Sequence, residues 1–142
     1  MNNQDCIFCK IVAGDIPCFK IYETGNILSF LDIGPVNKGH ALVIPKNHYK
    51  NIWDFPAELG AEVLTAAQVV GDAIVKATGA DGMNILMNNN AAAGQLVFHA
   101  HFHLIPRFKN DGFKLWKQSE YDNMDEASAL AQKIEKMIRS VN

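Results

Sequence analysis

Residues 99–107 read HAHFHLIPR, and this stretch places three of the five histidines of the chain at every second position of a hydrophobic run. Alternate side chains of a β-strand share one face of the sheet. A strand over residues 96–106 therefore predicts a row of three imidazoles on one face, at His99, His101 and His103. The side chains between them would point into a core: Phe98, Ala100, Phe102 and Leu104. Because a buried row of unpartnered imidazoles is costly, the pattern indicates a functional site.

Two kinds of chemistry would use such a row of imidazoles. A hydrolytic zinc site would need an open water position and usually a carboxylate base, and residues 83–110 contain no acidic residue. The alternative is nucleophilic catalysis, in which a neutral imidazole attacks a phosphoryl group and water releases the covalent intermediate. That reaction needs donors for the phosphate oxygens, and the loop just upstream offers several: Asn88, Asn89, Asn90, Gly94 and Gln95.

Five segments around and including this stretch have the length and apolar content of strands, at residues 19–24, 26–32, 40–46, 82–88 and 96–106. Thr24, Gly25 and Asn26 suit a turn between the first two. The short links between neighbouring segments favour antiparallel pairing.

Two further segments change to the period of a helix. Residues 56–78 repeat apolar side chains at helical spacing, with Asp54 predicted to cap the start and Gly79 to end the helix. The tail from 125 to 141 places apolar residues on one face, at Leu130, Ile134, Ile138 and Val141. The sequence therefore predicts an α+β fold with a mainly antiparallel sheet, one long helix and a C-terminal helix.

Length and composition predict a single folded domain over residues 1–142, with 49% hydrophobic and 20% charged residues. The formal net charge of −2 gives no general attraction to polyanions, so we expect no nucleic-acid partner. We find no apolar run of membrane-spanning length and no signal-peptide pattern, so we expect a cytoplasmic protein with no membrane partner.

Three blocks of the sequence together resemble the histidine triad family, and most closely the bacterial members of its Hint-like branch. The blocks are CIFCKIVAGDIPCFKIYE (6–23), ILSFLDIGPVNKGHALVIPKNH (27–48) and NNAAAGQLVFHAHFHLIPRF (89–108), and the last contains the family signature HAHFHLI (99–105). The resemblance covers residues 6–108 in the order that the family shows. It implies a homodimer in which two α+β protomers join their sheets, and a pocket for a purine nucleoside monophosphate.

The resemblance also implies a role for each matching residue. His101 would be the nucleophile that attacks the α-phosphorus, while His103 and His40 would orient it and share protons; with His99 they form the predicted catalytic set. Asp32 would contact the ribose hydroxyls. Asn88, Gly94 and Gln95 match the phosphate-loop positions. The wall around the base would comprise Ile7, Phe8, Ile11, Phe30, Leu31 and Ile33. The alternatives from the residues alone are that Asp32 caps a turn and that the apolar side chains are core.

One position departs from the family pattern. Animal members of this branch usually carry a serine or threonine after the Gly-Gln pair, and this chain has Leu96. The missing hydroxyl leaves open how the leaving group is recognised. The implied activity is hydrolysis or transfer of nucleotidyl phosphoramidates through a nucleotidyl-histidine. The alternatives are a dinucleoside polyphosphate hydrolase, a nucleotide-binding module with vestigial catalysis and, third, a zinc hydrolase.

The cysteines suggest a second site. Bacterial relatives with the same C-x-x-C pair hold zinc, and the matching ligands here are Cys6, Cys9, His48 and His99. Two thiolates and two imidazoles complete a tetrahedral shell, so this zinc would be structural. The alternatives are a redox pair and two buried thiols. Cys18 is most simply a buried apolar residue.

Overall fold

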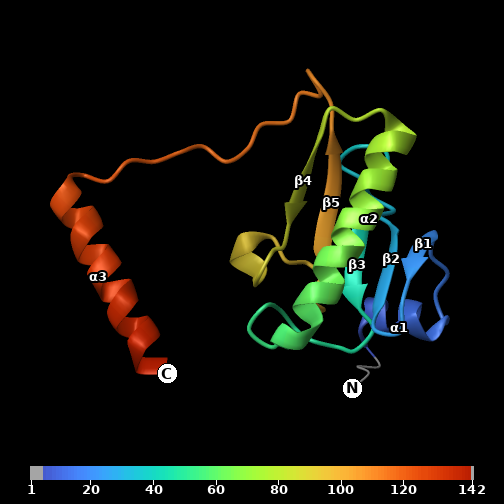
Figure 1. The fold of residues 1–142 in the computed structure, drawn as a ribbon, viewed down its shortest axis with the longest axis horizontal. Coiled ribbons are helices and arrows are strands. Elements are labelled where there is room, and N and C mark those ends of the chain that lie inside the picture. The colour runs from blue at the N-terminus through green and yellow to red at the C-terminus, as the bar shows by residue number, and fades with distance from the viewer. Residues whose placement is uncertain (1–4, 142) are drawn as a thin grey trace. The chain divides into compact units, whose positions relative to one another are not determined.

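Five strands form one antiparallel sheet in the computed structural model, which describes residues 5–141 (Figure 1). In spatial order they are β1 (Lys20–Glu23), β2 (Ile27–Leu31), β3 (Ala41–Pro45), β5 (Phe102–Arg107) and β4 (Gly82–Leu86). The helices are α1 (Ile7–Ala13), α2 (Gly60–Thr78) and α3 (Met124–Val141), with short 3-10 turns at Ala57–Leu59 and Ala91–Ala93. The predicted α+β class and antiparallel sheet are confirmed.

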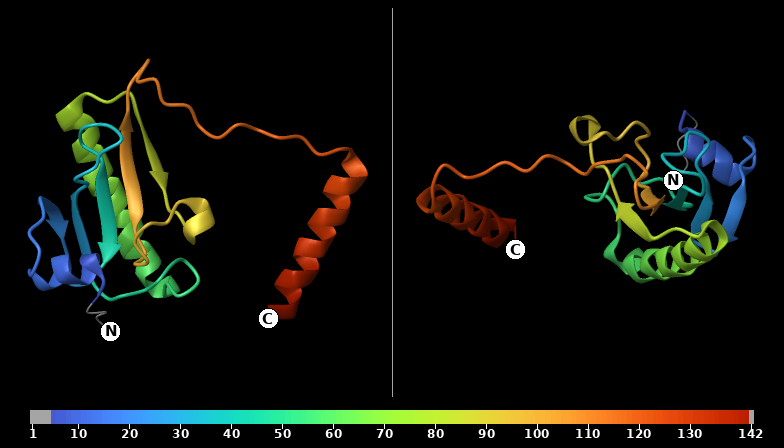
Figure 2. Two further views of the ribbon diagram at one scale, coloured as in Figure 1. Left: turned by 180° about the vertical axis from the view of Figure 1, so that it is seen from behind. Right: turned by 90° about the horizontal axis from the view of Figure 1, so that it is seen from above.

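The sheet has a hydrophobic core on each face. The long helix α2 lies across one face (Figure 2), where Ile27 and Leu31 of β2 pack against its buried side. Leu28 and Phe30 point to the opposite face and pack with side chains of α1. This alternation along β2 is the period-2 pattern of a strand buried on both sides.

The predicted C-terminal end of α2 is correct, and the predicted N-terminal end is not. Gly79 ends the helix with a φ of 69°, and its N–H donates to the Val75 carbonyl at 2.9 Å, as predicted. The predicted cap at Asp54 is wrong, because the helix begins at Gly60 after a 3-10 turn. The Asp54 carboxylate instead accepts from the Lys50 N–H at 3.2 Å.

The predicted strand over residues 96–106 is correct only from Phe102 onward. Its partner β3 ends at Pro45, which has no N–H to extend the ladder. The chain before β5 bonds elsewhere: the Ala100 N–H donates to the Tyr49 carbonyl at 2.6 Å. Phe98, predicted to be core, is 43% exposed, with the Lys50 ammonium 5.5 Å from its ring.

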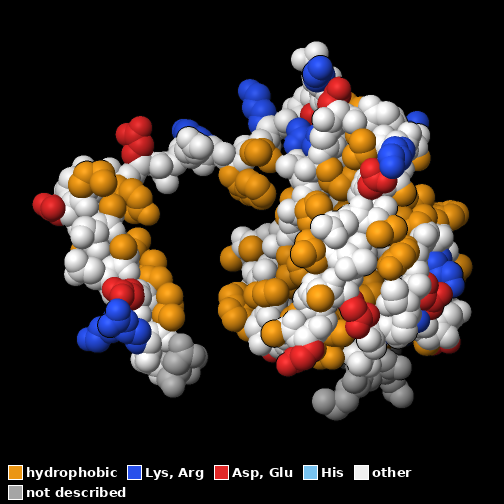
Figure 3. Space-filling model, viewed as in Figure 1, with side chains coloured by type: hydrophobic (Ala, Val, Ile, Leu, Met, Phe, Trp, Pro, Cys, Tyr) orange, Lys and Arg blue, Asp and Glu red, His pale blue; other side chains and the backbone are white. Residues whose placement is uncertain are grey.

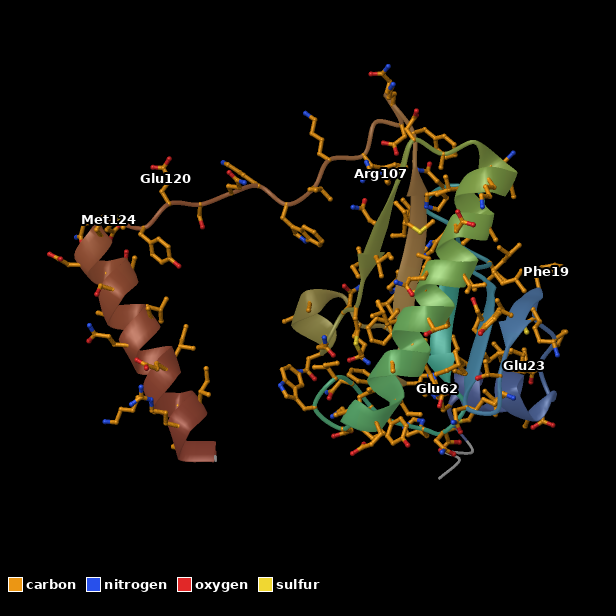
Figure 4. All side chains as sticks on the ribbon, in the orientation of Figure 1. Phe19, Glu23, Glu62, Arg107, Glu120 and Met124 are labelled. Atoms are coloured by element: carbon orange, nitrogen blue, oxygen red, sulfur yellow. The ribbon has the colours of Figure 1, made fainter. Side chains whose placement is uncertain are left out.

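The chain divides into two compact units, one ending at Asp111 and one beginning at Gly112. At the end of the first unit, Arg107 makes two hydrogen bonds to Asp111, at 2.7 and 2.9 Å, and one to Asn84 at 2.6 Å (Figure 4). The prediction of a single domain over residues 1–142 stays a prediction.

The second unit contains α3, whose hydrophobic side chains lie along one side of the helix (Figure 3). Leu130, Ile134, Met137 and Ile138 are 43 to 59% exposed. Within the described part of the chain, neither α3 nor any other helix has the length and apolar character needed to cross a membrane.

Candidate functional site

A cavity of about 310 Å³ opens beside α1 and β2, at the small end of the range for ligand pockets. All six side chains predicted to enclose a base line it: Ile7, Phe8, Ile11, Phe30, Leu31 and Ile33. Asp32, Gly94, His101 and His103 line it as well. The cavity therefore brings together apolar walls, a carboxylate and two histidines from distant parts of the sequence.

Sequence reasoning missed several further lining residues: Ile16, Pro17, Cys18, Leu42 and Val97. Three of them belong to the turn that follows α1, a helix that the sequence analysis did not predict. Cys18 is half-buried at the wall of the cavity, whereas the sequence suggested a buried position.

His101 has a fixed tautomer. Its Nδ1 lies 2.6 Å from the carbonyl oxygen of His99. Because a carbonyl only accepts, Nδ1 carries the proton and Nε2 keeps its lone pair. Burial of the imidazole lowers the pKa of His101 below 6.5, so the ring is neutral at pH 7. A neutral imidazole with a free Nε2 is the form that acts as a nucleophile.

His40 and His103 form a directed hydrogen-bond chain beside the nucleophile. The Val36 N–H donates to Nδ1 of His40 at 3.2 Å, so the proton of neutral His40 is on Nε2. That Nε2 lies 2.9 Å from Nδ1 of His103 and donates to it. His103 therefore carries its own proton on Nε2, and its ring centroid lies 4.9 Å from that of His101.

Burial is the main cause of the lowered pKa values of the histidines in this hydrogen-bond chain. It lowers the pKa of His103 to about 4, with smaller contributions in the same direction from His101 and His40. The pKa of His40 is also lowered, chiefly by burial, although Asp32 opposes the shift. The Asp32 carboxylate lies 3.7 Å from Nε2 of His40. The arrangement can therefore relay protons between neutral imidazoles at neutral pH.

Asp32 lies at the cavity wall with one oxygen committed to the backbone. Its Oδ1 accepts from the Gly34 N–H at 2.8 Å, which is the local turn that the alternative interpretation expected. Its other oxygen faces His40. Asp32 thus caps a turn and presents a carboxylate to the cavity at the same time.

The loop before the histidines is shaped by Gly94 and Gln95. Gly94 has a φ of 89°, which favours glycine, and a Cβ there would lie 3.5 Å from the Asn88 amide. The Gln95 side chain is buried: it donates to the Lys50 carbonyl at 2.7 Å and accepts from the Asn90 N–H at 2.8 Å. Its backbone N–H donates to the Asn90 carbonyl at 3.2 Å, so the donors of Gln95 are committed to holding the loop.

Cys6, Cys9, His48 and His99 form a second cluster, with ligand atoms within 4.8 Å of one another. The Sγ–Nδ1 distances are 3.5 Å for Cys6–His99, 3.4 Å for Cys9–His48 and 3.6 Å for Cys9–His99. Zinc bonds of about 2.3 Å to sulfur and 2.05 Å to nitrogen, at a tetrahedral angle, separate the two atoms by about 3.6 Å. The donor set and its spacing therefore fit a tetrahedral zinc ion.

The tautomer of His99 also fits a metal ligand. Its Nε2 donates to the Pro45 carbonyl at 2.8 Å, so the lone pair is on Nδ1, the atom that faces both sulfurs. Metal-bound histidines commonly make such a bond with their other nitrogen. In this arrangement the ring of His99 belongs to the cysteine cluster, and its carbonyl is what reaches His101.

Asp32, His40 and His103 also lie close enough to hold a metal ion. The hydrogen-bond directions argue otherwise, because the Val36 N–H occupies the Nδ1 lone pair of His40 and leaves a proton on Nε2. These directions favour a proton relay for this group and leave the cysteine group as the better candidate to hold a metal ion.

A family model described as the HIT domain matches residues 13–110, which include both clusters except the two cysteines. The chain belongs to the histidine triad family. It is 48% identical over 108 residues to the adenylylsulfatase HINT3 of Arabidopsis thaliana, covering 76% of this chain and 55% of that protein. It is 43% identical over 137 residues to the adenosine 5'-monophosphoramidase hnt1 of Schizosaccharomyces pombe, covering 96% of this chain and 100% of the relative. The Hint-like branch agrees with these matches.

Solved structures share the fold. A Streptococcus mutans protein matches with a TM-score of 0.90 at 46% identity, covering 96% of this chain and 87% of that one. A histidine triad family protein from Mycobacterium smegmatis, described as zinc-bound, matches with a TM-score of 0.74 at 37% identity, covering 97% and 98%.

Proposed function

We propose that this histidine triad protein hydrolyses purine nucleoside phosphoramidates, such as an adenosine phosphoramidate, through a covalent nucleotide on His101. The observation that carries the proposal is the free Nε2 of a neutral His101 in a cavity that also holds His103.

In the first step, Nε2 of His101 attacks the α-phosphorus, and a P–N bond to the ring forms as the P–N bond to the leaving amine breaks. An amine leaves readily only when its nitrogen gains a proton. Nε2–H of His103 donates to that nitrogen, and the positive charge that the attack leaves on the His101 ring offsets the proton that the relay gives up. In the second step, water attacks phosphorus, the P–Nε2 bond breaks, and the proton from water returns to the relay. The products are a nucleoside monophosphate and an amine.

The rest of the cavity suits the nucleoside. Asp32 would accept hydrogen bonds from the ribose hydroxyls, and the apolar side chains would enclose the purine. The Asn88 side-chain amide would donate to the phosphate, and the absence of a side chain at Gly94 would let the phosphate approach the loop closely.

Other leaving groups are the alternatives. One relative is named an adenylylsulfatase and another an adenosine 5'-monophosphoramidase. Sulfate and phosphate leave as anions and need less help from an acid than an amine does, so the directed relay favours the phosphoramidate. A dinucleoside polyphosphate hydrolase and a binding module with vestigial catalysis remain outcomes of the test.

We also propose a structural zinc ion held by Cys6, Cys9, His48 and His99, for which the donor spacing and the zinc-bound relative are the support. A filled shell of four protein ligands leaves no position for a catalytic water, which disfavours a zinc hydrolase. A homodimer and a cytoplasmic location stay predictions from the resemblance and the composition.

In the decisive experiment, the protein turns over a labelled adenosine phosphoramidate and the reaction is stopped rapidly without acid. The peptides are then analysed by mass spectrometry. We expect a mass increase of one adenylyl group on His101. An adduct on another residue would contradict the mechanism. Turnover without any adduct, abolished by a chelator while the fold persists, would favour a zinc hydrolase instead.

A further inference from the structure

The short helix α1 contributes to both clusters. Cys6, at its start, and Cys9 belong to the cysteine cluster, whereas Ile7 and Ile11 line the cavity. A helix of seven residues is not stable by itself in water. Its position therefore depends on what its side chains contact at each of the two sites.

Phe8 lies between the two sites. Its ring centroid is 5.8 Å from that of His99 and 5.2 Å from that of His101, with edge-to-face geometry in both cases. The same buried ring lines the cavity and packs against Phe30 of β2 at 5.7 Å. A shift of this ring cannot change one cluster without changing the other, because close-packed interiors transmit displacement.

The backbone of His99 is a second connection. Its ring faces the two sulfurs, and its carbonyl accepts the hydrogen bond that fixes the tautomer of His101. A metal ion bound to the ring of His99 would therefore also hold that carbonyl in place. The fully buried side chain leaves little room for the ring to move independently.

We propose that the metal site and the nucleotide cavity are energetically coupled through the first turn of α1 and through His99. The proposal rests on the proposed function, since it takes the cavity as the nucleotide site. Filling the metal site orders the wall of the cavity, and a nucleotide in the cavity retains the metal. Cys6, Cys9, His48 and the ring of His99 are in this sense positioning residues for His101.

Coupling of this kind is reciprocal, so it can be measured from either side. We expect saturating AMP to slow zinc release to a chromophoric chelator by about tenfold, a typical size for coupling between sites. Zinc removal should in turn weaken AMP binding measured by calorimetry; reciprocity fixes the two affinities to one factor, but it does not fix the change in release rate to that factor. Neither measurement depends on turnover.

Two variants test whether the coupling passes through the ring of Phe8. Phe8→Leu keeps all four metal ligands and removes the shared ring, so AMP should no longer slow zinc release. Ile33→Ala is the matched control: Ile33 lines the same cavity but is 89% exposed, so this variant should bind AMP more weakly and keep the coupling factor at saturation. Asp32→Asn, tested at the same AMP concentration, corrects for any zinc that AMP binds in solution.

The outcomes are distinct. Equal zinc-release rates with and without saturating AMP in the wild type would overturn the coupling and leave the proposed function intact. Failure of AMP to bind in calorimetry would overturn both. If the metal-free protein unfolds, the release rates of the zinc-loaded protein still decide, because that experiment begins from the folded state. A protein that takes up no zinc would overturn the coupling and the proposed zinc site, and leave the proposed reaction on His101 intact.

Discussion

His99 and His101 are the same side chain two residues apart, yet they lie in two clusters to which we assign different chemistry. In the cysteine cluster, Nε2 of His99 donates to a carbonyl and Nδ1 faces two sulfurs. In the proposed catalytic cluster, Nδ1 of His101 donates to a carbonyl, which leaves the lone pair on Nε2 of a ring that lines the cavity. We therefore propose that the nitrogen that the backbone occupies decides whether each histidine can serve as a ligand or as a nucleophile.

The largest effect should come from His101→Asn, which removes the nucleophile and leaves the cysteine cluster untouched. We expect the phosphoramidase kcat to fall at least about a thousandfold, because no other described side chain presents a free imidazole Nε2 at that point. Zinc content and AMP affinity, measured by elemental analysis and calorimetry, should stay near wild type. Retained turnover in this variant would show that His101 is not the nucleophile, and the division of roles between the two clusters would not hold.

Cys9→Ser is the reciprocal change, in the cluster for which we propose a structural role. Loss of a structural metal ligand should abolish zinc binding and lower the free energy of unfolding by roughly 3 kcal/mol. Urea unfolding and elemental analysis would check this result. Cys18→Ser is the matched control, since Cys18 lies outside the metal cluster. A zinc-free wild type of unchanged stability would show that the cysteines are only buried thiols.

The sequence predicted the content of these clusters better than the way they are built. Alternation brought His101 and His103 to one site, but only His103 lies on a strand, because pairing stops where Pro45 ends β3. The end of α2 at Gly79 could be predicted because a left-handed C-terminal cap is a local property. The seven residues of α1 could not, since tertiary contacts of Cys6, Phe8 and Cys9 hold them in place.

The pH dependence tests how far burial separates the catalytic cluster from solvent. The groups facing His103 are His40, His101 and Asp32, and the net effect with burial is a pKa of about 4. His103 therefore stays neutral as the pH falls through 6.5 and becomes charged only near pH 4. At about pH 5.5 an unperturbed imidazole would be roughly nine-tenths protonated, so we expect activity there about tenfold above what normal titration of His103 allows. NMR titration of the ring, beside the kcat profile, would check this; a midpoint near 6.5 would contradict it.

Leu96→Ser should have the smallest effect and should act at the mouth of the catalytic cavity alone. Leu96 lines that cavity and is 90% exposed, so the change in unfolding free energy should stay within about 0.5 kcal/mol. The new hydroxyl adds a donor for an anionic leaving group, and a hydrogen bond to a charged group contributes about 1.5 kcal/mol. We therefore expect kcat/KM for a dinucleoside polyphosphate to rise about tenfold relative to a phosphoramidate, with zinc content unchanged.

Ile33→Ser is the control, because Ile33 is equally exposed but lies next to Asp32. It should lower kcat/KM for both substrates and leave their ratio unchanged. If both variants alter the ratio equally, the leaving group is selected by the polarity of the whole rim and not at Leu96.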